Sequence, residues 1–155
     1  MKRATPFFAA IAAIVLVLAV GIFAGRTQNS SRAWGIGNPS PAVMIGGERV
    51  SVQLATTEAQ REQGLSGTQP LAADHGMLFV FPQDGQYHFW MKDMNYALDI
   101  IWIDGDGRIV SIAPSLSPDT YPQSFGPNAP ARYVLEVSAG FAAAHGVKVG
   151  DIVGL

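Results

Sequence analysis

The stretch from Gly76 to Val110, GMLFVFPQDGQYHFWMKDMNYALDIIWIDGDGRIV, is the strongest indication of a fold in this sequence. Apolar runs of strand length alternate in it with turn signals. Pro82 is followed by Gln-Asp-Gly-Gln, and residues 104–107 read Asp-Gly-Asp-Gly, both typical of tight turns between antiparallel strands. We therefore expect residues 76–110 to form a continuous antiparallel meander.

Alternation within this stretch assigns side chains to the faces of the expected strands. Successive residues of a strand point to opposite faces. In the strand after the first turn, His88, Trp90 and Lys92 therefore share one face, opposite to apolar and aromatic residues. In the strand expected over residues 98–103, Asp99 lies among apolar residues, where a buried carboxylate needs partners.

Shorter signals extend the domain toward the N-terminus. Residues 43–54 predict a hairpin that turns at a Gly-Gly pair, and Thr57 with Gln60 predicts a helix that starts with a capping box. Gly64 is a good residue to end that helix.

On the C-terminal side, residues 113–130 contain five prolines without periodicity and predict a long irregular loop. A strand over residues 132–137 follows, and then a second short helix over residues 138–145, with Ser138 as its cap.

These elements predict a β-rich α+β fold, an antiparallel barrel-like sheet with two short helices. One N-terminal hydrophobic helix precedes it. The expected organisation is a signal anchor or signal peptide at residues 1–26, a flexible linker at residues 27–42 and a single globular domain at residues 43–155.

The N-terminal segment predicts where the domain resides. Lys2 and Arg3 precede an apolar run from Phe7 to Ala24, whose helix would be roughly 27 Å long, close to the ~30 Å hydrocarbon core of a bilayer. Cleavage after Gly21 would release the domain into the periplasm. The length of the run favours an uncleaved anchor, with the domain outside the cytoplasmic membrane.

Composition limits the partners and cofactors that we expect. The formal charge of −2 becomes −5 when Lys2, Arg3 and Arg26 are set aside, which argues against nucleic-acid binding. The chain has no cysteine, and its histidines (His75, His88 and His145) lack the spacing of a zinc site. We expect neither a metal nor another cofactor.

Several motifs resemble one known family, the domain of unknown function that is number one hundred and ninety-two in its series. The resemblance implies a compact β-rich domain, often exported or anchored by an N-terminal helix, and it implies no established activity. The matching segments are AQREQGLSG at 59–67, GMLFVFP at 76–82, FWMKDM at 89–94, LDIIWIDGDGRIV at 98–110, YVLEVSAG at 133–140 and GVKVGD at 146–151.

A binding site is the leading functional hypothesis. His88, Trp90 and Lys92 would form a platform for a flat small ligand beside the loop of residues 113–130. The residues that we expect to complete the ligand-binding set are Asp99, Arg61 and Glu136. In the alternative arrangement Trp90 fills the core, while His88 and Lys92 lie near the rim.

Two other functions are alternatives to this binding site. Asp99 and Glu136 would serve as acid and base in a hydrolase of envelope glycans, if they lie at the separation that such catalysis requires. They would instead be structural if each pairs with a basic residue or accepts from backbone N–H groups. A third hypothesis is docking of an envelope protein at an apolar patch around Tyr121 and Phe125.

Overall fold

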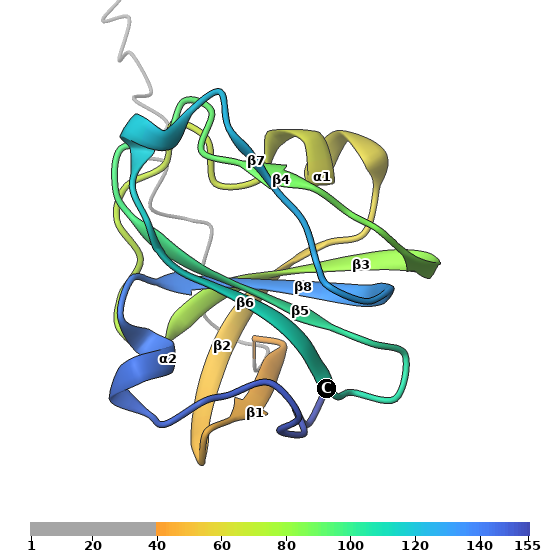
Figure 1. Ribbon diagram of the computed structural model, residues 1–155. Coiled ribbons are helices and arrows are strands. Elements are labelled where there is room, and N and C mark those ends of the chain that lie inside the picture. The colour runs from red at the N-terminus through yellow and green to blue at the C-terminus, as the bar shows by residue number, and fades with distance from the viewer. Residues whose placement is uncertain (1–39) are drawn as a thin grey trace, which may run out of the picture. The chain divides into compact units, whose positions relative to one another are not determined.

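The computed structural model describes residues 40–155 (Figure 1). The expected signal segment at residues 1–26 and most of the expected linker lie outside the described residues. No helix between residues 40 and 155 is long and apolar enough to cross a membrane.

Six strands form one mixed sheet in the order β1-β2-β3-β8-β5-β6, and β4 pairs with β7 in a small second sheet (Figure 1). The two short helices are α1 (Glu58–Gln63) and α2 (Phe141–Ala144). The strands are β1 (Ala42–Ile45), β2 (Glu48–Ala55), β3 (His75–Gly85), β4 (Phe89–Trp90), β5 (Leu98–Ile103), β6 (Ile109–Leu116), β7 (Ser124–Phe125) and β8 (Ala131–Ser138).

The β-rich class and the two short helices are confirmed, but the meander over residues 76–110 is wrong. Strand β8 lies between β3 and β5 and pairs antiparallel with both. Strand β2 runs parallel to β3, because α1 and its loop carry the chain back across the sheet. Strand β4, which was expected to continue the meander, pairs instead with β7.

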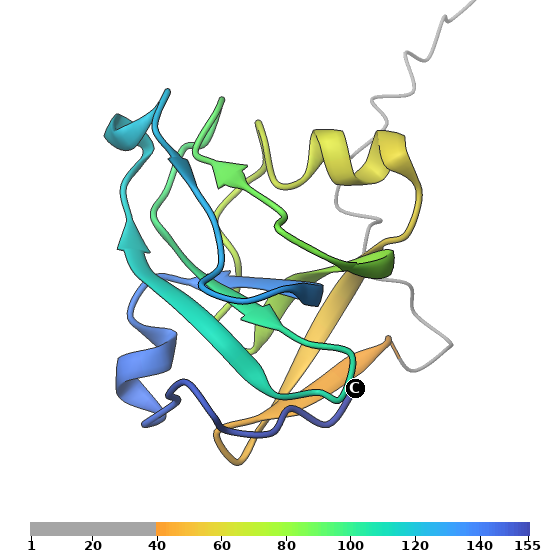
Figure 2. The same cartoon turned by 45° about the vertical axis from the view of Figure 1, so that its right-hand side comes forward.

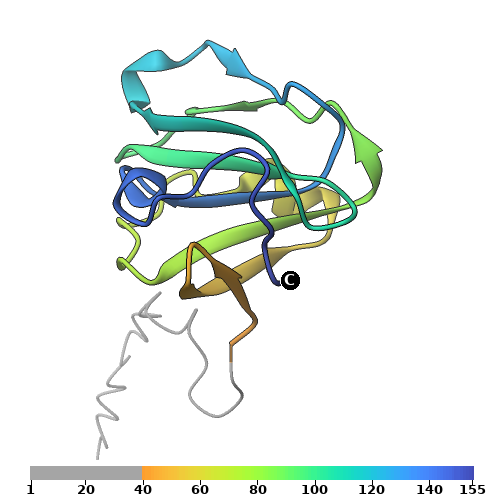
Figure 3. The same ribbon diagram turned by 60° about the horizontal axis from the view of Figure 1, so that its bottom comes forward.

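Among the described residues the sheet does not close into a barrel. Its two edge strands are β1 and β6. The C-terminal segment runs from α2 to the β1–β2 hairpin (Figures 1 and 3). Isolated bridges join Met44 to Gly154 and Arg108 to Ile152, so this segment contacts both edges of the sheet without forming a named strand.

Both faces of the sheet are buried, as the alternation of β5 predicts. Ile101 and Ile103 belong to the core that α2 covers. Ile100 and Trp102 belong to a second core on the other face, beneath α1 and β4 (Figure 2). Together these cores explain why β5 is buried along its whole length.

Local signals near the N-terminal side of the domain are confirmed. The hairpin turns at the Gly-Gly pair of residues 46–47. Thr57 accepts a hydrogen bond from the Gln60 backbone, and the Gln60 side chain accepts one in return from the Thr57 backbone, which completes the capping box. Helix α1 ends at Gly64.

Three local predictions need correction. Strand β3 continues through Pro82 to Gly85, because an irregularity after Val80 removes Pro82 from the regular ladder. Residues 113–130 are only partly irregular, since they include the end of β6, a 3-10 turn and β7. The N-cap position of α2 is occupied by Gly140 and not by the predicted Ser138. Gly140 has no side chain, so the side chain that caps the helix comes from elsewhere in the sequence.

That cap is Asp99. Its fully buried carboxylate accepts hydrogen bonds from the backbone N–H groups of Gly140 (3.0 Å), Ala142 (2.8 Å) and Ser115 (2.8 Å). Ser115 has a positive φ of 51° at an irregular point of β6. Asp99 therefore fastens both the start of α2 and the end of β6 to β5, and its partners are those of a structural carboxylate.

We predict that Asp99→Asn lowers the unfolding free energy of the full-length chain in detergent micelles by about 3 kcal/mol. The NH2 group of asparagine would replace one acceptor oxygen and face buried backbone N–H donors. Urea unfolding would measure the loss. Asp106→Asn is the matched control, since Asp106 is exposed in the β5–β6 turn. Equal, small effects of the two substitutions would contradict this structural role.

Candidate functional site

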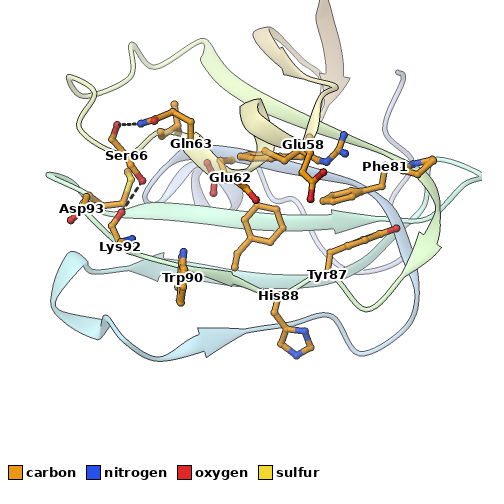
Figure 4. A pocket seen from close by; sticks show the side chains of 18 residues that line it. Glu58, Glu62, Gln63, Ser66, Phe81, Tyr87, His88, Trp90, Lys92 and Asp93 are labelled. Carbon is orange, nitrogen blue, oxygen red and sulfur yellow. Dashed lines mark hydrogen bonds between the residues drawn. The ribbon is translucent and has the colours of Figure 1, made fainter.

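A pocket of about 940 Å³ opens between α1 and the segment around β4, on the face of the sheet opposite α2 (Figure 4). Five of the six predicted site residues line it, and Asp99 does not. The lining comprises Glu58, Arg61, Glu62, Gln63, Gly64, Leu65, Ser66, Phe79, Phe81, Pro82, Tyr87, His88, Phe89, Trp90, Lys92, Asp93, Met94 and Glu136.

Glu136 is the buried polar group of this pocket. It projects from the central strand β8, where Met77 of β3 and Ile100 of β5 are its register partners. Only 5% of the residue is exposed, and its Oε2 atom has no hydrogen-bond partner among residues 40–155. Burial raises the pKa of Glu136 from 4.5 to about 8, so its carboxyl group is mostly protonated at neutral pH.

Aromatic rings form much of the remaining wall. Phe79 and Phe89 meet edge to face with ring centroids 4.8 Å apart. Phe81 and Tyr87 stack at 3.5 Å, with their planes 10° apart. The indole N–H of Trp102 donates to the Tyr87 backbone carbonyl (2.8 Å), which fixes this segment over the core. The walls are therefore anchored before any ligand arrives.

Arg61 anchors α1 to the sheet. Its Nη1 donates to the carbonyl oxygens of Thr56 (2.7 Å) and Val80 (3.0 Å). Its Cζ lies 5.2 Å from the centre of the Phe81 ring, a cation–π arrangement. Arg61 thus positions the α1 wall and the Phe81 ring together.

Hydrogen bonds to backbone carbonyls join the loop after α1 to the loop after β4. The Ser66 hydroxyl donates to the Lys92 carbonyl (2.9 Å), and the Gln63 amide donates to the Ser66 carbonyl (3.0 Å) (Figure 4). The Gly67 N–H donates to the Asp93 carbonyl (2.8 Å). The loop after α1 and the loop after β4 are therefore joined at one end of the pocket.

The three residues of the predicted platform, His88, Trp90 and Lys92, are exposed side chains of the β4 segment. Trp90 is 53% exposed, and its ring meets Tyr121 edge to face at 5.8 Å. The Lys92 Nζ lies 5.9 Å from the Trp90 ring. The His88 ring points away from the other labelled side chains (Figure 4) and lies beside Gly126. Burial along this segment follows the predicted alternation: Tyr87 and Phe89 are half-buried and pack on other aromatic rings, whereas the platform side chains are exposed.

The structure separates the predicted carboxylate pair. Asp99 is the register partner of Val137, whereas Glu136 is the register partner of Ile100. Because partners across a strand pair share a face and neighbours along a strand do not, Asp99 and Glu136 point to opposite faces of the sheet. They cannot act on one glycosidic bond, and Asp99 is already bound to three backbone N–H groups.

Sequence reasoning missed the acidic wall of the pocket, which comprises Glu58 and Glu62 of α1 and Asp93 of the facing loop. The spacing of the two glutamates by four residues was a usable signal, since it places them on one side of a helix. Nothing local connected that side to Glu136. Within residues 40–155, no three His, Cys, Asp or Glu side chains are grouped as metal ligands.

Two crystal structures resemble the domain. One is a protein from Sinorhizobium meliloti 1021, described as a candidate transcription regulator, which is 34% identical over 72% of this chain and 88% of its own, with a TM-score of 0.67. The other is a protein of unknown function from Novosphingobium aromaticivorans DSM 12444, which is 30% identical over 74% of this chain and 84% of its own, with a TM-score of 0.70. No curated protein matches the chain.

A family model covers the same part of the sequence. The model of DUF192, whose members are described as uncharacterized, matches residues 42–155, nearly the whole region that the structure describes. This is the family that the motifs of the sequence resemble, so that prediction is confirmed. The chain belongs to the DUF192 family.

Proposed function

We propose that this domain is a non-enzymatic module that binds a small organic ligand in the pocket above Glu136. The observation that carries the proposal is Glu136, which lines a roomy pocket and whose buried Oε2 atom has no hydrogen-bond partner among residues 40–155. Buried polar atoms in native proteins are nearly always hydrogen-bonded, and exceptions point to a role or to a missing partner. A ligand with a complementary polar group would supply that partner.

Comparison with Asp99 strengthens this proposal. Both carboxyl groups are buried in the same sheet, yet Asp99 receives three backbone hydrogen bonds, whereas Oε2 of Glu136 has no partner among residues 40–155 and burial raises the pKa of Glu136. The fold is therefore able to satisfy a buried carboxylate. Leaving Glu136 unsatisfied lowers stability, and binding is a function that would offset this loss.

The aromatic walls indicate the shape of the ligand. Phe79, Phe81 and Phe89 present apolar surface around the polar atoms of Glu136. Pockets of this kind bind a hydrophobic or flat body through their walls and fix its orientation through a few polar groups. We propose a ligand with one ring-sized apolar part and one polar group that reaches Glu136.

We further propose that the module works outside the cytoplasmic membrane, tethered through residues 7–24. The apolar length of that segment and the basic residues before it support this location. The flexible composition of residues 27–42 would let the domain stand away from the bilayer. The ligand would then be a solute of the cell envelope.

The binding proposal can be tested by methyl NMR on the full-length chain in lipid nanodiscs, with methionine methyl groups labelled. Met94 lines the pocket, and Met44 lies on β1 outside it. We expect single-ring fragments that carry one polar group to shift the Met94 signal selectively. Glu136→Leu should weaken their binding at least about tenfold, because the ligand loses its buried hydrogen bond.

Glu48→Leu is the matched control, since Glu48 is an exposed glutamate of β2 outside the pocket. It should leave the affinity unchanged. Fragments that shift only Met44, fragments that bind Glu136→Leu as tightly as the natural chain, or a screen in which Met94 never shifts would refute the pocket as a binding site.

We also predict that Glu136 makes stability depend on pH. Its carboxyl is ionised above about pH 4.5 in the unfolded chain but protonated up to about pH 8 in the folded chain, so the folded state binds the extra proton between these values. Stability should therefore fall as pH rises through this window. The expected loss between pH 5 and pH 8, relative to Glu136→Gln, is about 3 kcal/mol.

Urea unfolding of both full-length chains in detergent micelles would measure this difference. The two profiles should converge near pH 4 and run parallel above about pH 9. Parallel profiles over the whole range would show that Glu136 titrates normally, and its desolvation would then not be the feature that marks the site.

For the location, we expect the full-length chain with a C-terminal tag to remain in the membrane fraction of a Gram-negative host after an alkaline carbonate wash. Protease added to spheroplasts should digest the domain. A chain without residues 1–26 should remain in the cytoplasm and resist that protease. Recovery of a shortened, soluble form from the periplasm would instead identify the segment as a cleaved signal peptide.

A further inference from the structure

We propose that the ligand of this pocket presents a protonated amine, or another cationic N–H donor, to the Glu136 carboxylate. This inference rests on the proposed function, because it names the chemical class that the same pocket would recognise. Four features of the pocket support it: the buried acceptor, the acidic wall, the excess of carboxyl groups over basic groups in the lining and the aromatic surface.

The first feature is a buried hydrogen-bond acceptor, the carboxyl group of Glu136. Glu136 lines the open pocket, and its Oε2 atom is buried without a hydrogen-bond partner among residues 40–155. An ionised carboxylate is an acceptor only, and its strongest partners are charged N–H donors. In surroundings of low polarity such a pair attracts more strongly than it would in water.

The acidic wall adds a favourable field. Glu58 and Glu62 of α1 and Asp93 of the loop after β4 all line the pocket. None of the three forms a salt bridge with another described residue. Carboxylates that line a cleft raise the local concentration of cations and steer them inward.

The lining contains two basic side chains, Arg61 and Lys92. Arg61 directs its Nη1 donor to two backbone carbonyls and lies against Phe81. The Lys92 Nζ lies 5.9 Å from the centre of the Trp90 ring. The lining carries the carboxyl groups of Glu58, Glu62, Asp93 and Glu136 against these two basic groups, so it favours a cationic ligand over an anionic one.

The aromatic surface is also suited to a cation. Aromatic faces attract ammonium and guanidinium groups, and the Arg61–Phe81 contact is an intramolecular example within this pocket. Phe79 and Phe89 lie at the same pocket, so the apolar part of an amine can pack there while its charge reaches Glu136.

Binding of an amine to Glu136 must be linked to pH. The charged form of Glu136 is the form that accepts from an ammonium group, and burial makes this form scarce in the free protein below about pH 8. Binding therefore releases one proton from Glu136, and affinity rises with pH until the carboxyl is fully ionised. A neutral acceptor such as an alcohol binds the protonated form and shows the opposite slope.

Other ionisable groups near Glu136 must be distinguished from it. Burial raises the pKa of Tyr96, the hydrogen bond with Thr68 opposes this shift, and the charge of Glu136 adds to it, so Tyr96 is a group that interacts electrostatically with Glu136. The register partners of Glu136 on β3 and β5 are Met77 and Ile100, neither of which is ionisable. The remaining ionisable groups of the lining are Glu58, Arg61, Glu62, Tyr87, His88, Lys92 and Asp93.

Three matched probes test the inference on the full-length chain in nanodiscs, with Met94 as reporter and Met44 as internal control. Each probe joins a phenyl ring through two methylenes to one polar group: phenethylamine is a cation, 2-phenylethanol is neutral and 3-phenylpropanoate is an anion. We expect phenethylamine to bind at least about tenfold more tightly than the others at pH 8. Its affinity should rise roughly fiftyfold between pH 6 and pH 8.

Glu136→Gln should remove both the preference for the amine and its pH slope, because the amide cannot ionise. Tightest binding by the alcohol or the anion, with loss in Glu136→Gln, would overturn the cationic ligand but leave the pocket as a binding site. A slope that persists in Glu136→Gln and disappears in His88→Gln would overturn the role of Glu136. If no probe shifts Met94, the proposed function fails as well.

Discussion

The antiparallel pairing of β8 with β3 on one side and β5 on the other is the constraint on which this structure depends. The strand comes late in the chain but lies inside the sheet. Val134 packs into one core, and Leu135 and Val137 pack into the other. Because the side-chain period of a strand is two, a slip of one residue would exchange these faces and bring Glu136 into the core beneath α2. The packing of both cores therefore fixes Glu136 under the pocket.

The same sheet contains two buried carboxyl groups in opposite chemical situations. Asp99 meets the backbone N–H groups at the start of α2 and in β6, so burial strengthens its hydrogen bonds. Glu136 meets the pocket, where the described chain supplies no donor to Oε2. Burial of a polar group is stabilising or destabilising according to its partners, and only the second situation leaves capacity for a ligand. This contrast distinguishes the structural residue from the candidate binding residue.

The sequence predicted the local features that a few neighbouring residues determine. The capping box at Thr57, the Gly-Gly hairpin and the two faces of β5 are examples. It did not predict that β8 separates β3 from β5, because turn signals describe which strands are connected and not which strands pair. The pocket depended on that insertion: Glu62, Phe89 and Glu136 come from distant parts of the chain. Five of the six predicted site residues nevertheless line the pocket. The alternation of one strand indicated His88, Trp90 and Lys92, and Arg61 and Glu136 were expected as their partners from outside that stretch.

The rigidity of the walls determines what Glu136 can do. Arg61 holds α1 to β3, and the Ser66–Lys92 contact joins the loops at the other end, so the walls have little freedom to collapse onto the carboxyl. A flexible pocket would close and provide Oε2 with a donor from the chain. Here the surroundings that disfavour the carboxylate in the free protein are the same surroundings that strengthen its attraction to an incoming N–H⁺ group, because both effects arise from the exclusion of water. The free-energy cost of ionising Glu136 in the free protein and its preference for a cationic ligand thus have one physical origin.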